Sequence, residues 1–198
     1  MILSHLQRRI LGGSFLAWAG LLLTGCVSPS GHTAGDQRQE ILRQHEAIVS
    51  EFVAEHPYGR KQLDHAAGYA TTTNLQTQVL FVGAGNGYGV AVRGADGKKT
   101  FLKSKEIAGG PGVGIASYRT LLVFRDDYAY DQFVRGKWIY QAEADATAQL
   151  DGAGGGAQAT AELHQPVTIY HMSGSGLQAK ATLGSVKFEP DYRLNGEY

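Results

Sequence analysis

The sequence predicts a mainly β domain of the α+β class, with antiparallel strands in a barrel-like or sandwich core and two or three covering helices. A helical period runs through residues 36–56, and an alternation with period two follows it over most of the remaining chain. Glycine is abundant, at 27 of 198 residues, whereas proline is rare, at 5. Because the glycines are interleaved with Val, Tyr and Thr, this composition favours closely packed strands over disorder.

The N-terminus has the features of an export signal. Residues 1–10 carry Arg8 and Arg9 without an acid, and residues 10–23 carry no charge. At about 1.5 Å per helical residue, this apolar run of about 14 residues is shorter than a hydrocarbon core of about 30 Å, which favours a cleaved signal over a membrane helix. The cleavage region, "LLLTGC", resembles the bacterial lipobox Leu-x-Gly-Cys. We therefore predict a signal peptide over residues 1–25 and acyl chains such as palmitate on Cys26. The alternative is a reactive or buried thiol after an ordinary signal.

Acylation of Cys26 predicts attachment to the bacterial cell envelope. Two or three chains anchor a protein stably, since each buried methylene contributes about 0.8 kcal/mol. Val27 follows the cysteine, where an Asp is the usual inner-membrane retention signal, so the expected location is the outer membrane, facing the periplasm. Residues 27–35 are small and polar, and we expect residues 26–35 to comprise the acylated Cys and a flexible tether.

Residues 36–198 are expected to form one domain, which is long enough for a real core. The full chain has 18 basic and 18 acidic residues, and cleavage removes two arginines and no acid, so the mature charge is about −2. This balance gives no electrostatic footprint for a nucleic-acid partner. With a single cysteine, the domain has no disulfide framework and must be stabilised by packing.

The first predicted element is a helix over residues 36–56. Asp36 is the expected N-cap, and Pro57 ends the helix. The apolar side chains fall on one arc of about 140°; they are Ile41, Leu42, His45, Ile48, Val49, Phe52 and Val53. A short second helical turn is expected between Tyr58 and Ala66.

The next elements are strands. Residues 76–103 predict a strand, a Gly-rich turn, a strand, a hairpin turn at Ala95-Asp96-Gly97 and a further strand. Residues 113–124 predict two more strand segments, of which 120–124 is apolar enough to be buried on both faces. Asp126 or Asp127 caps a short helix that Gly136 ends. Further strands are expected over 137–148, 157–163, 166–172 and 176–188, for a total of about eight to ten.

Several motifs resemble ligand sites without meeting their requirements. Gly83, Gly85, Gly87 and Gly89 follow an apolar strand, but a dinucleotide fingerprint needs a glycine three positions after the second one and then a helix. "GGPGVG" (109–114) lacks the Lys-Ser/Thr of a phosphate loop, so we predict a close-packed turn or bulge there. The seven histidines are scattered, and no acid/base pair has a catalytic spacing. We therefore expect no metal, no cofactor and no enzymatic activity.

Two basic clusters remain as candidate contacts. Arg60 and Lys61 form one cluster. The other comprises Lys98, Lys99, Lys103 and Lys105, at the hairpin turn and on the strand that follows it. Each cluster is either a solvated turn or a contact with lipid headgroups.

The chain from about residue 40 to 198 resembles the SYLF domain family of bacterial lipoproteins and eukaryotic membrane-associated proteins. The motifs that carry the resemblance are "HAAGYATTT", "GAGNGYGVAVR", "GGPGVGIASYRTLLVF", "DQFVRGKWIYQAEADATA" and the ending "VTIYHMSGSGLQAKATLGSVKFEPDYRLNGEY". The ending is the most specific, with "SGSGL", Glu-Pro-Asp, Asn195 and Tyr198 in the family's order.

The resemblance implies lipid binding, by phosphoinositide recognition and an N-terminal amphipathic helix in eukaryotic members. Helix 36–56 departs from that pattern, because its polar face carries Glu40, Glu46, Glu51 and Glu55 against Arg38 and Arg43. We therefore expect this helix to dock on the β-domain rather than on an anionic bilayer. The expected function is a membrane-anchored lipoprotein whose domain binds a phospholipid or an acyl chain. The alternative is a structural envelope module that contacts an unknown protein partner without a lipid ligand.

Overall fold

The computed structural model describes residues 27–137, 139–141, 166–172 and 183–196. Cys26, the predicted signal peptide and the predicted strands over 142–148, 157–163 and 176–182 lie outside these residues. Within the described segments, no helix combines the length and the apolar character needed to cross a bilayer.

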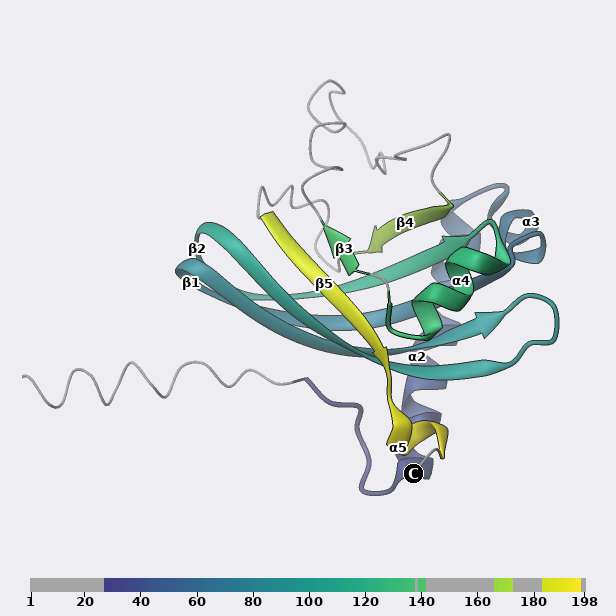
Figure 1. The fold of residues 1–198 in the computed structure, drawn as a ribbon, viewed down its shortest axis with the longest axis horizontal. Helices are drawn as coiled ribbons and strands as arrows, with labels where there is room; N and C mark the ends of the chain where they lie inside the picture. Colours follow the sequence, from purple (N-terminus) through teal and green to yellow (C-terminus); the bar gives the residue numbers. More distant parts are fainter. Residues whose placement is uncertain (1–26, 138, 142–165, 173–182, 197–198) are drawn as a thin grey trace, which may run out of the picture.

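Two strands of 26 residues each form one long antiparallel hairpin (Figure 1). Strand β1 (Gly68–Arg93) pairs with β2 (Lys99–Phe124) from Gly68↔Phe124 to Val92↔Lys99. The turn that joins them lies where the Asp-Gly pair predicts it, and Gly97 adopts a φ of 68°, which glycine tolerates without strain.

The hairpin bends back on itself near Leu80, so that the second half of β1 lies against the first half. A Cβ built on Gly85 would lie 2.7 Å from the Leu75 carbonyl oxygen, and the Gly94 N–H donates to the Ala67 carbonyl at 2.8 Å. The prediction of a Gly-rich turn within residues 76–103 is therefore wrong. The glycines lie inside a continuous strand, where the absence of side chains permits close backbone approach.

The remaining strands pair along the free edge of β2. Strand β5 (Leu183–Pro190) pairs with residues 102–109 of β2, and β4 (Val167–Met172) pairs with residues 119–124. The short strand β3 (Ile139–Gln141) extends the sheet beyond β5. The mainly β, α+β class is confirmed, but the described strands form one open, bent sheet rather than a closed barrel. The two halves of β1 meet through close backbone packing at Gly85, Gly87 and Gly89 instead of completing a ladder.

One long helix covers the outside of this bent sheet. Helix α2 (Ala34–Glu55) begins after Thr33, whose side chain accepts from the Asp36 N–H at 3.1 Å while the Asp36 carboxylate accepts from the Thr33 N–H. Thr33 and not Asp36 is thus the N-cap, and Asp36 completes a capping box. The predicted docking of this helix is confirmed, because it buries Ile41, His45, Ile48 and Phe52.

Three short helices complete the described fold. Helix α3 (Gly59–Asp64) provides the expected second helical turn. Helix α4 (Asp127–Val134) has Asp126 as its N-cap, and Gly136 follows it with a φ of 69°, as predicted. Helix α5 (Tyr192–Asn195) packs near α2.

The apolar core is divided among three places. Inside the bend, residues from both hairpin halves pack with Phe133 of α4 and Phe188 of β5. Outside one half, Phe52 of α2 packs on Tyr170 of β4. Outside the other half, Ile41 packs with residues of β1, β2 and α5. Residues 120–124 are all buried, as predicted, and Leu121 to Phe124 contribute alternately to the first two clusters.

Candidate functional site

The bend of the hairpin exposes a cluster of large apolar side chains, which we call the apolar tip. It holds seven of the ten exposed large hydrophobic residues within the described part of the chain. Phe81 is 69% exposed and Val113 is 80% exposed. Its members are Val79, Leu80, Phe81, Val82, Ile107, Val113 and Ile115. Monomeric soluble proteins rarely expose a large contiguous apolar cluster to water, so a cluster of this kind marks an interaction site.

The backbone at the apolar tip is irregular. Leu80 adopts a φ of 59°, a left-handed conformation that is costly for a leucine, and the β1–β2 register shifts between Leu80 and Val82. Gly110 and Gly114 on β2 also have positive φ values. Of the close-packed turn or bulge predicted at 109–114, the bulge is confirmed, because Gly110 and Pro111 on β2 lie opposite Phe81 alone. The close packing is wrong, because most of this segment is exposed strand. Such strain concentrates at functional positions.

The interior behind the apolar tip is polar. Asn74, Gln76 and Gln78 alternate along β1 and are buried, each at most 5% exposed. Ser104 Oγ donates to Asn74 Oδ1 at 2.6 Å, and Tyr118 Oη donates to Glu106 Oε2 at the same distance. This end of the bent sheet thus has polar groups inside and apolar groups outside, which is the reverse of a soluble core.

Charge is absent from the apolar tip and reappears in a row behind it. No charged residue occurs from Gly68 to Val92 on β1 or from Ile107 to Tyr118 on β2. Lys105 lies in register with Asn86 on one side and with Lys187 of β5 on the other, so these three residues cross the sheet on one face. We call Lys105 and Lys187 the cation row.

One acid lies beside the cation row. Glu189 contacts Lys187 at 2.8 Å and Lys105 at 3.8 Å, and the hydrogen bond from Lys187 holds the pKa of Glu189 below its ordinary value. Both lysine side chains remain about half exposed or more. The row therefore presents a net positive charge to a partner that covers this face.

The structure separates the six predicted basic contacts. Arg60 and Lys61 are exposed on α3, and Lys98 and Lys99 are exposed at the hairpin turn. Both lie at the opposite end of the long hairpin from the apolar tip (Figure 1). Lys103 and Lys105 are closer to the tip, on the strand that leads to it. Lys187 was not a sequence candidate, because nothing in the sequence alone places β5 beside β2.

The first described residue is fixed to the same face of β1. The Val27 N–H donates to Asn86 Oδ1 at 2.9 Å, and Asn86 Nδ2 donates to the Val27 carbonyl at 2.6 Å. Val27 also packs against the buried cluster around Ile41 and Tyr88. The structure differs here from the flexible tether expected over residues 27–35, since Ala34 and Gly35 also belong to α2. Cys26, the predicted acylation site, precedes Val27 and lies outside the described residues.

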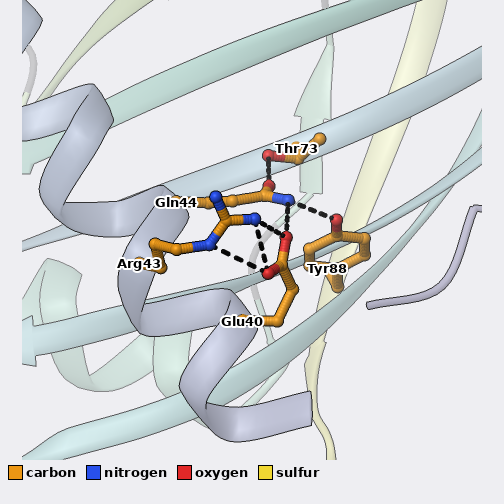
Figure 2. Close-up of polar contacts among 5 residues, drawn as sticks. All are labelled: Glu40, Arg43, Gln44, Thr73 and Tyr88. Carbon is orange, nitrogen blue, oxygen red and sulfur yellow. Dashed lines mark hydrogen bonds and ion pairs between the residues drawn. The ribbon is translucent and has the colours of Figure 1, made fainter. Parts of the chain in front are cut away.

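A polar network attaches α2 to both halves of β1 (Figure 2). Gln44 accepts a hydrogen bond from Thr73 Oγ1 at 2.7 Å and donates to Tyr88 Oη at 2.9 Å. Gln44 also donates to Glu40, which forms an ion pair with Arg43. Because Thr73 and Tyr88 belong to different halves of the bent strand, Gln44 holds the two halves together from outside.

Neither of two hollows beside α2 has the shape of an acyl-chain cavity. The first is filled by its own lining, which includes His45, Thr71 and Tyr88. The second, with a volume of about 330 Å³, is open and lined by polar groups such as Asp36 and Arg43. Within the described part of the chain, no cluster of three or more His, Cys, Asp or Glu side chains is arranged to hold a metal ion.

Comparison with known proteins finds one informative similarity. The chain is 27% identical over 162 residues to Beta cell expansion factor A of Aeromonas veronii. The aligned region covers 82% of this chain and 60% of that protein, so the chain spans less than two thirds of its relative's length. No protein-family model matches the chain.

Proposed function

We propose that this chain is a lipid-anchored protein of the bacterial envelope whose SYLF-like β-domain binds a phospholipid bilayer through the apolar tip. The observation that carries the proposal is the reversed polarity of the bent hairpin, with apolar side chains outside and Asn74, Gln76 and Gln78 inside. Strand segments that face lipid have this arrangement, because hydrocarbon favours apolar surface and the polar side chains face away from it.

A bilayer fits the apolar tip better than a folded protein partner does. The tip lies at the bend, which forms one end of the sheet (Figure 1), so its side chains can insert into a bilayer ahead of the rest of the domain. The tip carries no charged side chain, and charge complementarity is what gives protein interfaces much of their specificity. The cation row behind the tip is complementary to anionic headgroups. The SYLF resemblance and the lipobox at Cys26 independently favour a lipid environment.

Acylation of Cys26 and outer-membrane residence, facing the periplasm, belong to the same proposal. The apolar tip then supplies a second attachment besides the acyl chains, and two attachments hold a protein on a membrane far longer than one. The bound lipid is part of the bilayer in this proposal, since the hollows beside α2 do not accommodate an acyl chain.

Vesicle flotation tests the tip directly. The test protein begins at residue 26 and carries Cys26→Ser, so it has no acyl chain. We compare Phe81→Asp with Tyr128→Asp, because Tyr128 is 75% exposed on α4, outside the tip. Burial of a large apolar side chain is worth about 1.5–3 kcal/mol, so the Phe81 change is expected to weaken vesicle binding roughly tenfold or more. The Tyr128 change is expected to leave it unaltered.

Two results would overturn the proposal. One is an acyl-free protein that does not float with neutral or anionic vesicles at any salt concentration. The other is a Phe81→Asp protein that floats as well as Tyr128→Asp. If Phe81→Asp instead converts a self-associated protein to a monomer without affecting flotation, the apolar tip is a protein contact, as the structural alternative requires.

A further inference from the structure

The position of Val27 sets where any anchor on Cys26 begins. The two hydrogen bonds between the Val27 backbone and the Asn86 side chain imitate a ladder pair, and the Val27 side chain adds apolar contact. The Cα atoms of consecutive residues are about 3.8 Å apart. The acyl chains proposed for Cys26 therefore start one residue from Val27, which Asn86 holds in place.

Asn86 lies on the same face of β1 as part of the apolar tip. Alternate residues of a strand share a face, so Asn86, Ala84 and Val82 point to one side. At about 3.3 Å per residue, Val82 lies about 13 Å further along the strand than Asn86, and the bend at Leu80 lies about 20 Å further. The anchor and the tip thus follow one another along a single strand face.

We infer that the Val27–Asn86 pair holds the acyl anchor beside the apolar tip, so that both enter the same leaflet of the same membrane. The inference rests on the proposed function. The apolar extension of about 13–20 Å beyond the anchor compares with one leaflet, which is half of a hydrocarbon core of about 30 Å. It is too short for the tip to cross the whole core.

The cation row supports this depth. Lys105 is the register partner of Asn86, and Lys187 is the register partner of Lys105. The row therefore lies at the level of the anchor, where headgroups meet the acyl chains, and Ile107 lies two residues closer to the bend than Lys105. Lysines at this level keep their charge in the headgroup region while the residues ahead of them enter hydrocarbon.

A free tether would have a different consequence. About ten flexible residues have an end-to-end distance of roughly 17 Å, enough for the domain to rotate and present its tip to a second membrane. Fixing Val27 to Asn86 removes this freedom. The pair accordingly directs the tip to the membrane that holds the anchor, rather than to an opposing one.

The test uses the acylated protein in phosphatidylethanolamine–phosphatidylglycerol vesicles. Cys26 is the one native cysteine and acylation consumes its thiol, so a Phe81→Cys protein takes an environment-sensitive dye at the tip alone. A nitroxide phospholipid is placed either in the host vesicles or in added protein-free vesicles. We expect quenching by the host vesicles and none by the added ones.

Two changes loosen the anchor. One is Asn86→Ala, and the other is a ten-residue Gly-Ser insertion between Cys26 and Val27. Each is expected to produce quenching by the added vesicles and to lower the host-to-added quenching ratio at least threefold. Gln37→Ala is the matched control, because it removes a side-chain bond to the Gly31 carbonyl in the same segment and leaves the Val27–Asn86 pair intact. It is expected to behave as the unaltered protein.

The outcomes separate this inference from the proposed function. An unaltered acylated protein that is quenched by added vesicles, or an Asn86→Ala protein that keeps the original ratio, overturns the inference alone. An acyl-free protein with Cys26→Ser and the dye at position 81 tests the proposed function separately, because its tip must bind a vesicle without an acyl anchor. If no vesicle quenches that protein, the proposed function fails.

Discussion

Gly89 crosses the backbone of Thr71 so closely that a Cβ on Gly89 would overlap the Thr71 carbonyl oxygen. Both residues belong to β1, on opposite sides of the bend. The two halves of the strand are therefore in direct backbone contact, and position 89 requires a residue without a side chain.

Replacing Gly89 by alanine should open this crossing. Because the obstructing atom is backbone and cannot rotate away, we expect Gly89→Ala to lower the free energy of unfolding by about 3 kcal/mol or more. Gly112→Ala is the control, since its Cβ would meet nothing closer than 3.4 Å. Urea denaturation measures both. Equal midpoints for the two variants would show that the close crossing does not exist.

The docking of α2 can be tested at Phe52. This side chain is fully buried and packs on Tyr170 with ring centroids 4.7 Å apart. Phe52→Ala should therefore reduce the free energy of unfolding by about 3–5 kcal/mol. Tyr58→Ala, at a side chain that is 79% exposed, should have little effect. A loss of no more than about 0.5 kcal/mol at Phe52 would mean that α2 is not docked on the sheet. It would then favour binding of this amphipathic helix to a bilayer, as the SYLF resemblance implies.

His45 predicts a dependence of stability on pH. Its Nδ1 lies 2.9 Å from Thr71 Oγ1, and burial, with a smaller contribution from the Lys99 charge, lowers its pKa to about 4. The unfolded chain binds the proton near pH 6.5. Between pH 6.5 and 4 the unfolded chain binds this proton and the folded protein does not, so the free energy of unfolding falls as the pH is lowered. Above pH 6.5 and below pH 4, His45 adds no further pH dependence.

The expected loss over this interval is about 3 kcal/mol. It is measured as the difference in unfolding free energy between the unaltered protein and His45→Gln at several pH values, because the glutamine retains polar groups and does not titrate. Parallel pH profiles for the two proteins would contradict a buried neutral His45.

The lipobox interpretation has its own test. Cys26→Ala should abolish labelling with radioactive palmitate and block signal removal, since the thiol is the atom that accepts the lipid and the lipobox peptidase acts on the acylated precursor. Labelling that persists in the variant would show that Cys26 is not the acylation site. The alternative of an ordinary signal predicts normal cleavage without any label.

The sequence was informative where burial follows apolar periodicity. The arc through Ile48 and Phe52 predicted the buried face of α2, and the Asp-Gly pair predicted the turn between β1 and β2. The capping interaction was displaced by three residues, because Thr33 and Asp36 can each serve as a cap when the helix start is unknown.

The bent hairpin was not predicted, because its burial contradicts the usual pattern. Buried Asn74 and Gln76 look like a solvated strand in the sequence, and exposed Leu80 and Phe81 look like its core. The glycines from 83 to 89 look like a turn, yet they permit a strand crossing between residues whose contact no local pattern encodes. One signal was available: the absence of charge from Gly68 to Val92 and from Ile107 to Tyr118.

The final prediction concerns which lysines meet the headgroups. In the tip-first orientation, Lys105 and Lys187 lie at the membrane surface, whereas Lys98 and Lys99 lie at the far end of the hairpin. We compare two double variants of the acyl-free protein, Lys105→Gln with Lys187→Gln, and Lys98→Gln with Lys99→Gln. Each change removes one positive charge at a partly or fully exposed side chain, so each double variant loses two charges and the two variants are matched.

The first pair should weaken flotation with anionic vesicles, by at most about 1 kcal/mol per lysine because Glu189 already offsets part of the charge. Flotation with neutral vesicles should not change. Raising the salt from about 0.1 M to 1 M shortens the Debye length from about 10 Å to about 3 Å, so it should remove the anionic preference and leave the contribution of the apolar tip. The Lys98–Lys99 pair should have no effect under either condition. Weakening by that pair to the same extent would mean that the sheet lies flat on the membrane, and that the tip does not enter first.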